Sequence, residues 1–249
     1  MKFHILESGS KGNCTVVQSG ESFLIIDCGG TKKYLEKCFS DVGIDYHRAE
    51  ALLVTHEHSD HIKQIKMFTD LKIYVPDVIE GICEEAILKP LEIVKIGPFT
   101  VLPIPLSHDC SHTLGYIIHD GKETLVSVTD TGYVSHSNEE LIRGADYYIF
   151  ESNHDTDMLM NSTRPVYLKD RILSNNGHLC NEDSALVLSR IISDNTKEIV
   201  LAHISEECNT PALAYNTLIS TLNRHNIDYS NCRISVARQF SRYSGGSEE

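Results

Sequence analysis

Three histidines and an aspartate occur within six residues of this chain, in the segment Thr55-His-Glu-His-Ser-Asp-His61. Neutral imidazole and carboxylate groups suit divalent transition metals. Histidines two positions apart in an extended segment point to the same side, so we expect His56 and His58 to bind one ion together. Asp60 and His61 follow on the turn into a helix, where they are placed to reach a second ion. The alternative is an exposed polar loop with histidines by chance.

Further potential ligands follow other apolar stretches of the chain. The apolar segment 51–54 is predicted to be a buried strand that ends at the histidine cluster. Three later segments have the same form, and their polar residues are His108 after 101–106, Asp130 after 125–128 and His203 after 199–202. His112 is an alternative to His108, while Asp130 could be a turn residue and His203 a buried strand-end histidine. Their joint occurrence with the cluster favours a site for two ions.

The elements that must position these residues alternate between strands and helices along the chain. Apolar runs bounded by turn residues predict strands, and apolar residues at helical spacing predict helices. Two groups of strands with helices outside them indicate an α/β sandwich. We treat residues 1–243 as one domain and residues 244–249 as a flexible tail. The expected strands are 3–6, 14–18, 22–26, 51–54, 72–75, two within 91–105, 114–119, 123–128, 146–150, 198–202 and 232–236. The expected helices are 31–42, 61–69, 78–88, 137–143, 165–173, 181–192 and 211–223.

Composition limits the function classes. The chain has 249 residues and a formal net charge of −13, which works against broad nonspecific binding to phosphate backbones. A polyanionic substrate must therefore be held locally, by metal ions and a few arginines. The 8 cysteines form no CxxC pair, so we expect reduced thiols in a cytoplasmic protein. No signal sequence and no run of about 18 apolar residues is present, so we expect a soluble protein without a membrane segment.

Together these motifs resemble the metallo-β-lactamase superfamily. The resemblance implies an αββα sandwich, in which two mixed β-sheets are flanked by helices and a dinuclear metal site lies along one edge of the sheets. It implies that Asp27, in Leu24-Ile-Ile-Asp-Cys-Gly29, supports the metal ligands from outside. It also implies that His56, His58 and His108 bind one ion, that Asp60, His61 and His203 bind the other, and that Asp130 bridges them.

Three later blocks resemble the phosphodiesterase branch of this superfamily. They are Phe150-Glu-Ser-Asn-His-Asp155, Asn176-Gly-His-Leu-Cys-Asn-Glu182 and Leu201-Ala-His-Ile-Ser-Glu206. In that branch a histidine at the position of His178 lies near the leaving oxygen, and a carboxylate at the position of Glu151 orients it. The alternative is a helix-entry turn at Gly177-His178, with Asn181 as the helix cap.

The narrowest resemblance is to the YycJ/WalJ-like bacterial metallohydrolases, and it covers about residues 3–210. It rests on Ser8-Gly-Ser-Lys-Gly-Asn13, the histidine cluster, Thr129-Asp-Thr-Gly-Tyr-Val-Ser135 and the Glu151 and His178 blocks. Members are described as 5′→3′ exodeoxyribonucleases implicated in DNA repair, which implies DNA with 5′ ends, single- or double-stranded, as substrate. This sequence departs from the family at Gln64, where glycine is expected, at Cys180, where serine is expected, and in the stretch 160–165.

The implied reaction is hydrolysis of a phosphodiester with two divalent cations, zinc or manganese, with iron a third candidate. Asp60 is expected to accept a proton from the attacking water, and His178 to protonate the leaving oxygen. Ser10, Lys11 and Asn13, in the glycine-rich segment, are candidates to contact phosphate. Two basic groups could hold a nucleic-acid backbone or form solvated surface, and they are Arg164, Lys169 and Arg171, and Arg233, Arg238 and Arg242.

Other functions fit parts of the same pattern. A small-molecule phosphodiesterase, for example for cyclic nucleotides, suits the acidic balance of the chain. Thioester or lactone hydrolysis leaves the Gly177-His178 block unexplained. A metal-binding regulatory protein of cell-wall signalling without turnover would not require the full set of ligands.

Overall fold

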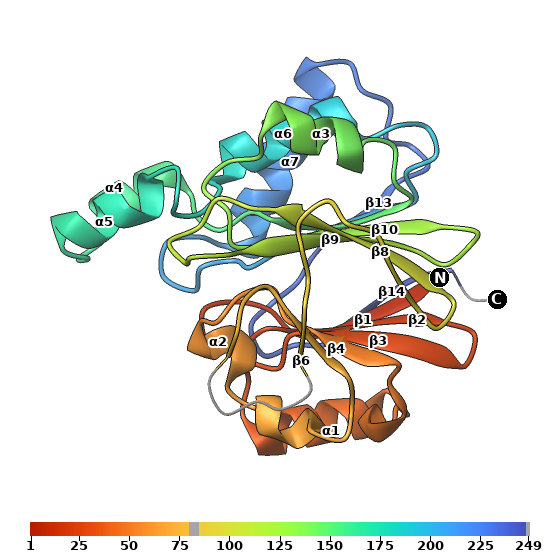
Figure 1. Ribbon diagram of the computed structural model, residues 1–249. Helices are drawn as coiled ribbons and strands as arrows, with labels where there is room; N and C mark the ends of the chain where they lie inside the picture. The colour runs from red at the N-terminus through yellow and green to blue at the C-terminus, as the bar shows by residue number, and fades with distance from the viewer. Residues whose placement is uncertain (80–84, 248–249) are drawn as a thin grey trace.

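Two seven-stranded sheets lie face to face, with helices on both outer faces (Figure 1). The computed structural model describes residues 1–79 and 85–247. The first sheet has the order β14-β1-β2-β3-β4-β5-β6 and the second has the order β13-β12-β11-β10-β9-β8-β7. This arrangement confirms the predicted αββα sandwich.

The strands of the first sheet are β1 (Lys2–Glu7), β2 (Cys14–Ser19), β3 (Ser22–Ile26), β4 (Ala51–Leu53), β5 (Ile73–Val75), β6 (Glu85–Ile87) and β14 (Tyr243–Gly246). Those of the second sheet are β7 (Val94–Ile96), β8 (Phe99–Pro105), β9 (Leu114–His119), β10 (Thr124–Val128), β11 (Tyr147–Glu151), β12 (Glu198–Ala202) and β13 (Arg233–Val236). The helices are α1 (Lys32–Asp41), α2 (Ser59–Ile62), α3 (His136–Ile142), α4 (Thr156–Asn161), α5 (Val166–Leu173), α6 (Asn181–Ile191) and α7 (Pro211–Arg224), with 3-10 helices at Tyr46–Arg48 and Ile65–Phe68.

Each sheet is half antiparallel and half parallel. In the first sheet, β14, β1, β2 and β3 pair antiparallel, while β3, β4, β5 and β6 pair parallel. In the second, β7 to β10 pair antiparallel, while β10, β11, β12 and β13 pair parallel. Neighbouring parallel strands end at the same edge of their sheet, so residues that follow them are brought close together.

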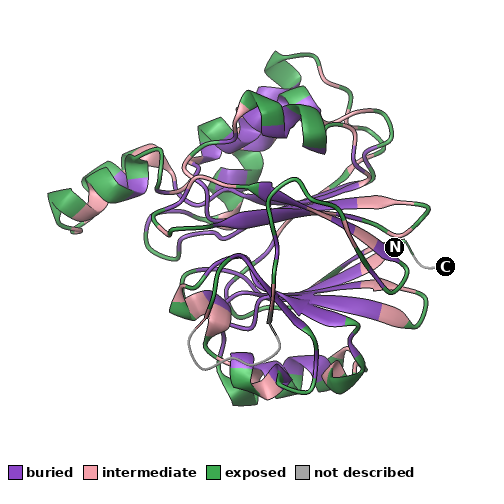
Figure 2. Cartoon of the chain, in the orientation of Figure 1, coloured by how far each residue is buried: buried purple, intermediate pink, exposed green. Residues whose placement is uncertain are grey.

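Three apolar layers hold the sandwich together, and Figure 2 shows the sheets as its most buried part. The central layer joins the two sheets and includes Phe3 and Ile5 from one sheet and Phe99 and Tyr147 from the other. A second layer packs α1 against the first sheet, and a third packs α3, α6 and α7 against the second. Helices α4 and α5 instead project from the body beside the second sheet (Figure 1).

Helix ends follow local sequence signals. The Thr31 side chain accepts a hydrogen bond from the Tyr34 amide at the start of α1, and Thr210 caps α7 ahead of Pro211. Helix α6 is capped by the Cys180 sulfur, which accepts from the Asp183 amide. Asn181 is therefore the first helical residue and not the cap that the alternative interpretation required.

Three expected elements differ from the structure, and one α-helix was not expected. The helix expected at 78–88 is wrong for Glu85–Ile87, which form β6 and pair with β5, while residues 80–84 lie outside the described residues. The helix expected at 61–69 is divided into α2 and a 3-10 helix, and α4 was not expected. Residues 244–246 belong to β14, which pairs with β1, and therefore do not form the expected flexible tail. Residues 248–249 lie outside the described residues.

Candidate metal centre

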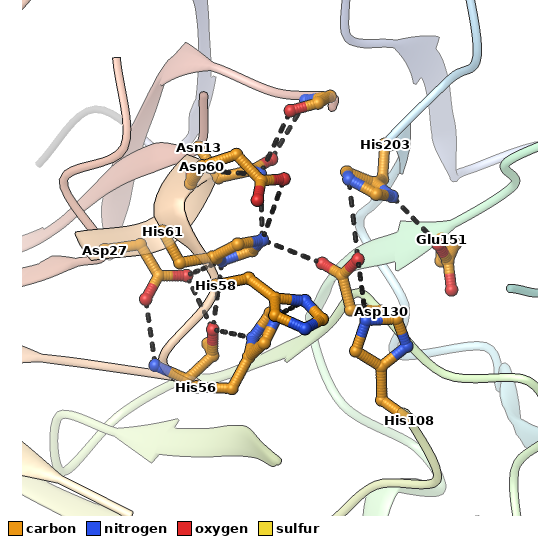
Figure 3. Close-up of polar contacts among 12 residues, drawn as sticks. Asn13, Asp27, His56, His58, Asp60, His61, His108, Asp130, Glu151 and His203 are labelled. Atoms are coloured by element: carbon orange, nitrogen blue, oxygen red, sulfur yellow. Dashed lines mark hydrogen bonds and ion pairs between the residues drawn. The ribbon is translucent and has the colours of Figure 1, made fainter. Parts of the chain in front are cut away.

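The predicted metal ligands, together with Asp27 and Glu151, lie at or after the carboxyl end of a strand (Figure 3), whereas His178 lies between helices α5 and α6. In the first sheet, Asp27 follows β3, and the histidine cluster follows β4. In the second sheet, His108 follows β8 and Asp130 follows β10. The last residue of β11 is Glu151, and His203 follows β12. The site therefore lies where the edges of both sheets meet.

Three of these strand-end residues have a left-handed backbone. The φ angles are 59° at Asp27, 60° at Asp130 and 55° at His203. Residues other than glycine rarely adopt this conformation, which costs on the order of 1–3 kcal/mol and clusters at functional sites. The chain thus turns sharply as it leaves each of these strands.

A close backbone contact positions the histidine cluster. A side-chain carbon added at Gly29 would lie 1.5 Å from the Asp60 carbonyl oxygen, so only glycine fits there. The Cys28 amide donates to the His61 carbonyl over 2.7 Å, and the Asn13 amide donates to the Asp60 carbonyl over 2.8 Å. These contacts fix α2 against the loop that follows β3.

The side chains converge in overlapping groups. Within each group, one potential ligand atom from every residue lies within 4.8 Å of the others. The groups are His56, His58 and His108; Asp60, His61 and His203; His56, His61 and Asp130; and Asp130, Glu151, His178 and His203. The first two are the two ligand sets that the family resemblance implies, and Asp130 shares a group with members of each. His112 instead lies 3.0 Å from Asp77, on the exposed surface outside these groups.

Outer hydrogen bonds orient three of the imidazoles. His61 Nδ1 lies 2.7 Å from Asp27 Oδ2, and His203 Nδ1 lies 2.9 Å from Glu151 Oε1. His108 Nδ1 lies 3.1 Å from the Gly177 carbonyl oxygen. Such bonds to Nδ1 leave Nε2 as the atom available to a metal ion. Asp27 is itself held by the Thr55 amide, which donates to Oδ1 over 2.8 Å, and by the Thr55 hydroxyl, which donates to Oδ2 over 2.9 Å.

Asp130 and Glu151 are ionised at neutral pH. Burial opposes ionisation of Asp130, which is 2% exposed, but His203 and His61 hold its pKa well below the usual range. Burial also opposes ionisation of Glu151, yet His178 and His203 lower its pKa to about 2. Burial lowers the pKa of His203, but Asp130 and Glu151 outweigh it and raise that pKa to about 9. For His56, burial dominates and lowers the pKa.

The donor set fits divalent cations. Asp130 Oδ2 and His203 Nε2 are buried and have no hydrogen-bond partner among the described residues. Asp130 Oδ2 lies 3.1 Å from His61 Nε2, itself a candidate ligand atom. A buried polar atom without a partner costs about 1–3 kcal/mol, and a metal ion bound here would satisfy both atoms. Imidazole nitrogens with a few carboxylate oxygens suit zinc, manganese or iron.

A histidine–carboxylate pair adjoins the centre. His178 Nδ1 lies 2.8 Å from Glu151 Oε1, and the His178 side chain is 19% exposed. Glu151 is fully buried, and its Oε2 accepts from the Thr131 amide over 2.8 Å. His178 lines a cavity of about 260 Å³, called the catalytic cavity below, together with His108, Asp130, His203 and residues of α5. The predicted partners thus lie together at the edge of the open part of the site.

The predicted phosphate-contact residues differ in their environments. Ser10 lines the catalytic cavity. Lys11 is exposed, and its ammonium lies 2.5 Å from Glu206. Asn13 is buried, accepts from the Gly9 amide over 2.9 Å and places its Nδ2 3.0 Å from His61 Nε2. The Asn13 side chain therefore shapes the loop, which does not support the predicted phosphate contact.

Two residues that contact the site were not singled out from the sequence. Asn153 lines the catalytic cavity, and its Nδ2 donates to the His203 carbonyl over 2.9 Å. Thr55 holds Asp27, as described above. Thr55 could have been found from its place after β4, next to His56, and Asn153 from its place after β11, two residues beyond Glu151.

The two basic groups are largely engaged in pairs. Arg164 and Arg171 line the catalytic cavity and pair with Glu207 and Asp109. Lys169 donates to the carbonyls of Met160 and Ser162. Of the second group, Arg233 pairs with Glu198 and Arg242 pairs with Asp41, while Arg238 makes no ion pair within residues 1–79 and 85–247.

Comparisons with known proteins agree with this geometry. Residues 25–204 match the family model described as "Beta-lactamase superfamily domain". The chain is 37% identical over 227 residues to exodeoxyribonuclease YycJ of Bacillus anthracis, covering 86% of each chain. It is 30% identical over 236 residues to exodeoxyribonuclease WalJ of Streptococcus pneumoniae, covering 89% of this chain and 88% of that one. The crystal structure of the metallo-beta-lactamase fold protein YhfI from Bacillus subtilis superimposes with a TM-score of 0.73 at 18% identity, covering 98% of this chain and 99% of that chain.

The family model covers most of the chain, and the two exodeoxyribonucleases match it over nearly their whole length. The fold and the groups of histidines and aspartates agree with this relationship. The chain therefore belongs to the metallo-β-lactamase superfamily, is close to YycJ and WalJ, and is a metal-dependent hydrolase.

Proposed function

We propose that the protein is a dinuclear metal-dependent phosphodiesterase that acts as a 5′→3′ exodeoxyribonuclease. The observation that carries this proposal is the His178–Glu151 pair, 2.8 Å apart, at the edge of the cavity beside the metal-ligand groups. A histidine held by a carboxylate is suited to protonate the leaving oxygen of a phosphodiester. The names of the YycJ and WalJ relatives support DNA as the substrate.

We assign the metal ligands from the groups described above. His56, His58 and His108 would hold one ion, Asp60, His61 and His203 the other, and Asp130 would bridge them. Zinc or manganese suits this set, with iron a third candidate. Ions bound there would supply activation of water near neutral pH and neutralisation of the charge on the phosphate.

The chain's own residues then move two protons. Asp60 accepts a proton from the attacking water, whose oxygen forms the new bond to phosphorus. His178 donates its proton to the leaving oxygen as the old phosphorus–oxygen bond breaks. Glu151 stays ionised because its pKa is about 2, so it holds the His178 Nδ1–H and stabilises the protonated ring. Asp27 and Glu151 keep His61 and His203 in the orientation that directs Nε2 inward.

Individual basic residues near the metal ions must hold the negatively charged substrate, because the protein itself carries a net charge of −13. Arg164 and Arg171 line the catalytic cavity, and their pairs with Glu207 and Asp109 lie at the surface. Exposed ion pairs are worth about 0–1 kcal/mol, so a phosphate can compete for either guanidinium.

We place the protein in the cytoplasm, which the free thiols of Cys110 and Cys180 support. Within the described residues, no helix is both long and apolar enough to cross a membrane.

The test compares metal-loaded protein on DNA substrates that differ only in their ends. Metal-free protein is reloaded with Mn²⁺ or Zn²⁺ and incubated with linear DNA labelled at its 3′ end, with or without a 5′ phosphate, and with closed circular DNA. We expect mononucleotides to be released from 5′ ends and the circle to remain intact. Cleavage of the circle, or release from 3′ ends, would contradict an exonuclease of this polarity, and hydrolysis of cyclic mononucleotides alone would favour the small-molecule alternative.

Two variants separate the metal centre from other effects. Asp60→Ala should lose at least about a thousandfold in kcat/KM because it removes both a ligand and the proton acceptor. His112→Ala is the matched control, since this histidine lies on the exposed surface outside the ligand groups. We expect it to keep wild-type activity. Full activity of Asp60→Ala in folded protein would defeat the proposal.

A further inference from the structure

A second cavity adjoins the catalytic one. Its volume is about 570 Å³, and it is lined by residues 204–206 and 209–211, which follow β12, and by residues 237–241, which follow β13. Ser205 lines both cavities. None of the proposed metal ligands lines the second cavity. It is therefore a separate space whose lining begins at Ile204, the residue after His203.

An exposed aromatic ring marks this cavity. Phe240 is 56% exposed, although large apolar side chains are usually buried. The edge of the Tyr34 ring supports it, with ring centroids 5.8 Å apart and an interplanar angle of 81°. The Lys11 ammonium lies over the Phe240 ring, 5.5 Å from its centroid. The Lys11 side chain is exposed, so a planar base can take its place on the ring while the ammonium binds the adjoining phosphate.

The floor of the cavity holds this arrangement in place. Gln239 is buried, and its Nε2 donates to Glu7 Oε1 over 3.1 Å and to the Gly12 carbonyl over 3.0 Å. Gln239 Oε1 accepts from the Lys11 amide over 2.9 Å. The residue before Phe240 is thus bonded to the glycine-rich loop that carries Ser10 and Lys11. The second cavity and the catalytic cavity therefore share one fixed wall.

Two cations can take up a phosphate here: Arg238 lines the cavity, and Lys11 lies over the Phe240 ring. Arg238 is exposed and makes no ion pair in the described part of the chain. Lys11 pairs with Glu206, but both side chains are about half exposed or more. Such a pair contributes little, so a phosphate can replace the Glu206 carboxylate. In a chain of net charge −13, an unpaired arginine beside an exposed aromatic ring is the arrangement expected of a nucleic-acid contact.

We propose that this second cavity binds a nucleobase of single-stranded DNA by stacking on Phe240, with an adjoining phosphate held by Lys11 and Arg238. The proposal rests on the proposed phosphodiesterase function and names the part of the site that holds the strand near the scissile phosphate. Stacking on an aromatic ring requires no base-specific hydrogen bonds and is tolerant of sequence. That tolerance is what processive removal of successive nucleotides requires.

The test varies the ring and compares two substrates. Phe240→Ala removes the stacking surface, Phe240→Leu keeps apolar volume without a π-face, and Phe240→Trp keeps an aromatic face. Leu141→Ala is the control, because Leu141 is an exposed apolar residue of α3 that lines neither cavity. For each variant, kcat and KM are measured on a 5′-phosphorylated oligodeoxynucleotide and on bis(4-nitrophenyl) phosphate, which has no nucleobase.

We expect Phe240→Ala to raise KM for the oligonucleotide at least about fivefold, or about 1 kcal/mol, with a smaller change in kcat. The ratio of kcat/KM for DNA to kcat/KM for the small diester should fall by a similar factor. Phe240→Leu should resemble Phe240→Ala, and Phe240→Trp should restore the wild-type values. Leu141→Ala should match the wild type on both substrates.

A binding measurement separates failure of this proposal from failure of the proposed function. Fluorescence anisotropy with labelled single-stranded DNA is recorded for the same variants, without turnover. Cleavage of DNA with no dependence of KM or affinity on Phe240 would overturn the stacking site and leave the phosphodiesterase standing. Affinity that depends on Phe240 in a protein that cleaves neither substrate would support the stacking site and overturn the phosphodiesterase.

Discussion

Glu7 provides a quantitative test of how burial changes the pKa of a carboxyl group in this fold. It is the last residue of β1, is 2% exposed, and its Oε2 has no hydrogen-bond partner within the described ranges. Burial raises its pKa from the ordinary 4.5 to about 7, although the Gln239 hydrogen bond and Lys63 oppose the shift. Between these values the unfolded chain has lost the proton that the folded protein keeps, so stability falls as pH rises.

The expected magnitude follows from the two pKa values. Each pKa unit corresponds to about 1.4 kcal/mol, so ionisation of Glu7 costs the folded state up to about 3 kcal/mol above pH 7. Glu7→Gln cannot ionise and avoids this cost. The free energy of unfolding of the variant minus that of the wild type should therefore increase by up to about 3 kcal/mol from pH 4.5 to pH 7.5.

The assay is urea unfolding of both proteins after metal removal, at four pH values between 4.5 and 7.5. All other titrating groups are common to the two proteins and cancel in the difference. Glu21→Gln, at an exposed turn, controls for the loss of one negative charge at the surface. A difference that is constant or decreases with rising pH would refute the reasoning, whatever its absolute size.

Three further predictions concern the metal centre. Gly29→Ala should destabilise the protein by about 1–3 kcal/mol and weaken metal binding, because the added carbon collides with the Asp60 carbonyl. Urea unfolding measures the first effect and metal titration the second. Wild-type values in both assays would contradict the contact. His178→Ala should lower kcat about 10²–10⁴-fold while the metal content stays at the wild-type level, so loss of metal in this variant would instead make His178 a ligand. Metal ions at a hundred times their Kd should raise the free energy of unfolding by about 2.7 kcal/mol. Removing them with a chelator should therefore lower the Tm measured by calorimetry by about 5–11 °C. An unchanged Tm would argue against tight binding in this site.

The positions of the candidate ligands at strand ends could be predicted from the sequence because each residue is tied to a strand by a few covalent bonds, whereas their division into two complete ligand sets came from the resemblance to the metallo-β-lactamase superfamily. The segment 51–54 is apolar enough to be recognised as a strand, and the spacing of His56 and His58 then places both side chains on one side of the chain that follows it. The same reasoning places Asp130 and His203. This reasoning predicts at which edge of its sheet a residue lies. The structure then shows which residues of the two sheets meet at that edge.

Other features depend on contacts between distant segments and leave little local signal. The segment before Lys89 is rich in helix-forming residues, but pairing with β5 makes residues 85–87 a strand. Residues 243–246 contain two glycines and read as a tail, yet they pair with β1. Arg164 and Arg171 are separated by 43 and 62 residues from the acidic groups they contact, so their place at the catalytic cavity could not be predicted from spacing.

The position of the centre at the junction of the two sheets has a consequence for folding. The first sheet supplies the side chains between His56 and His61, and the second supplies His108, Asp130 and His203, so neither half of the chain carries a complete set. An ion bound by both halves acts as a crosslink between them. Loaded protein should unfold as one cooperative unit, whereas the stripped protein has only the apolar layer between the sheets to keep its two halves in register.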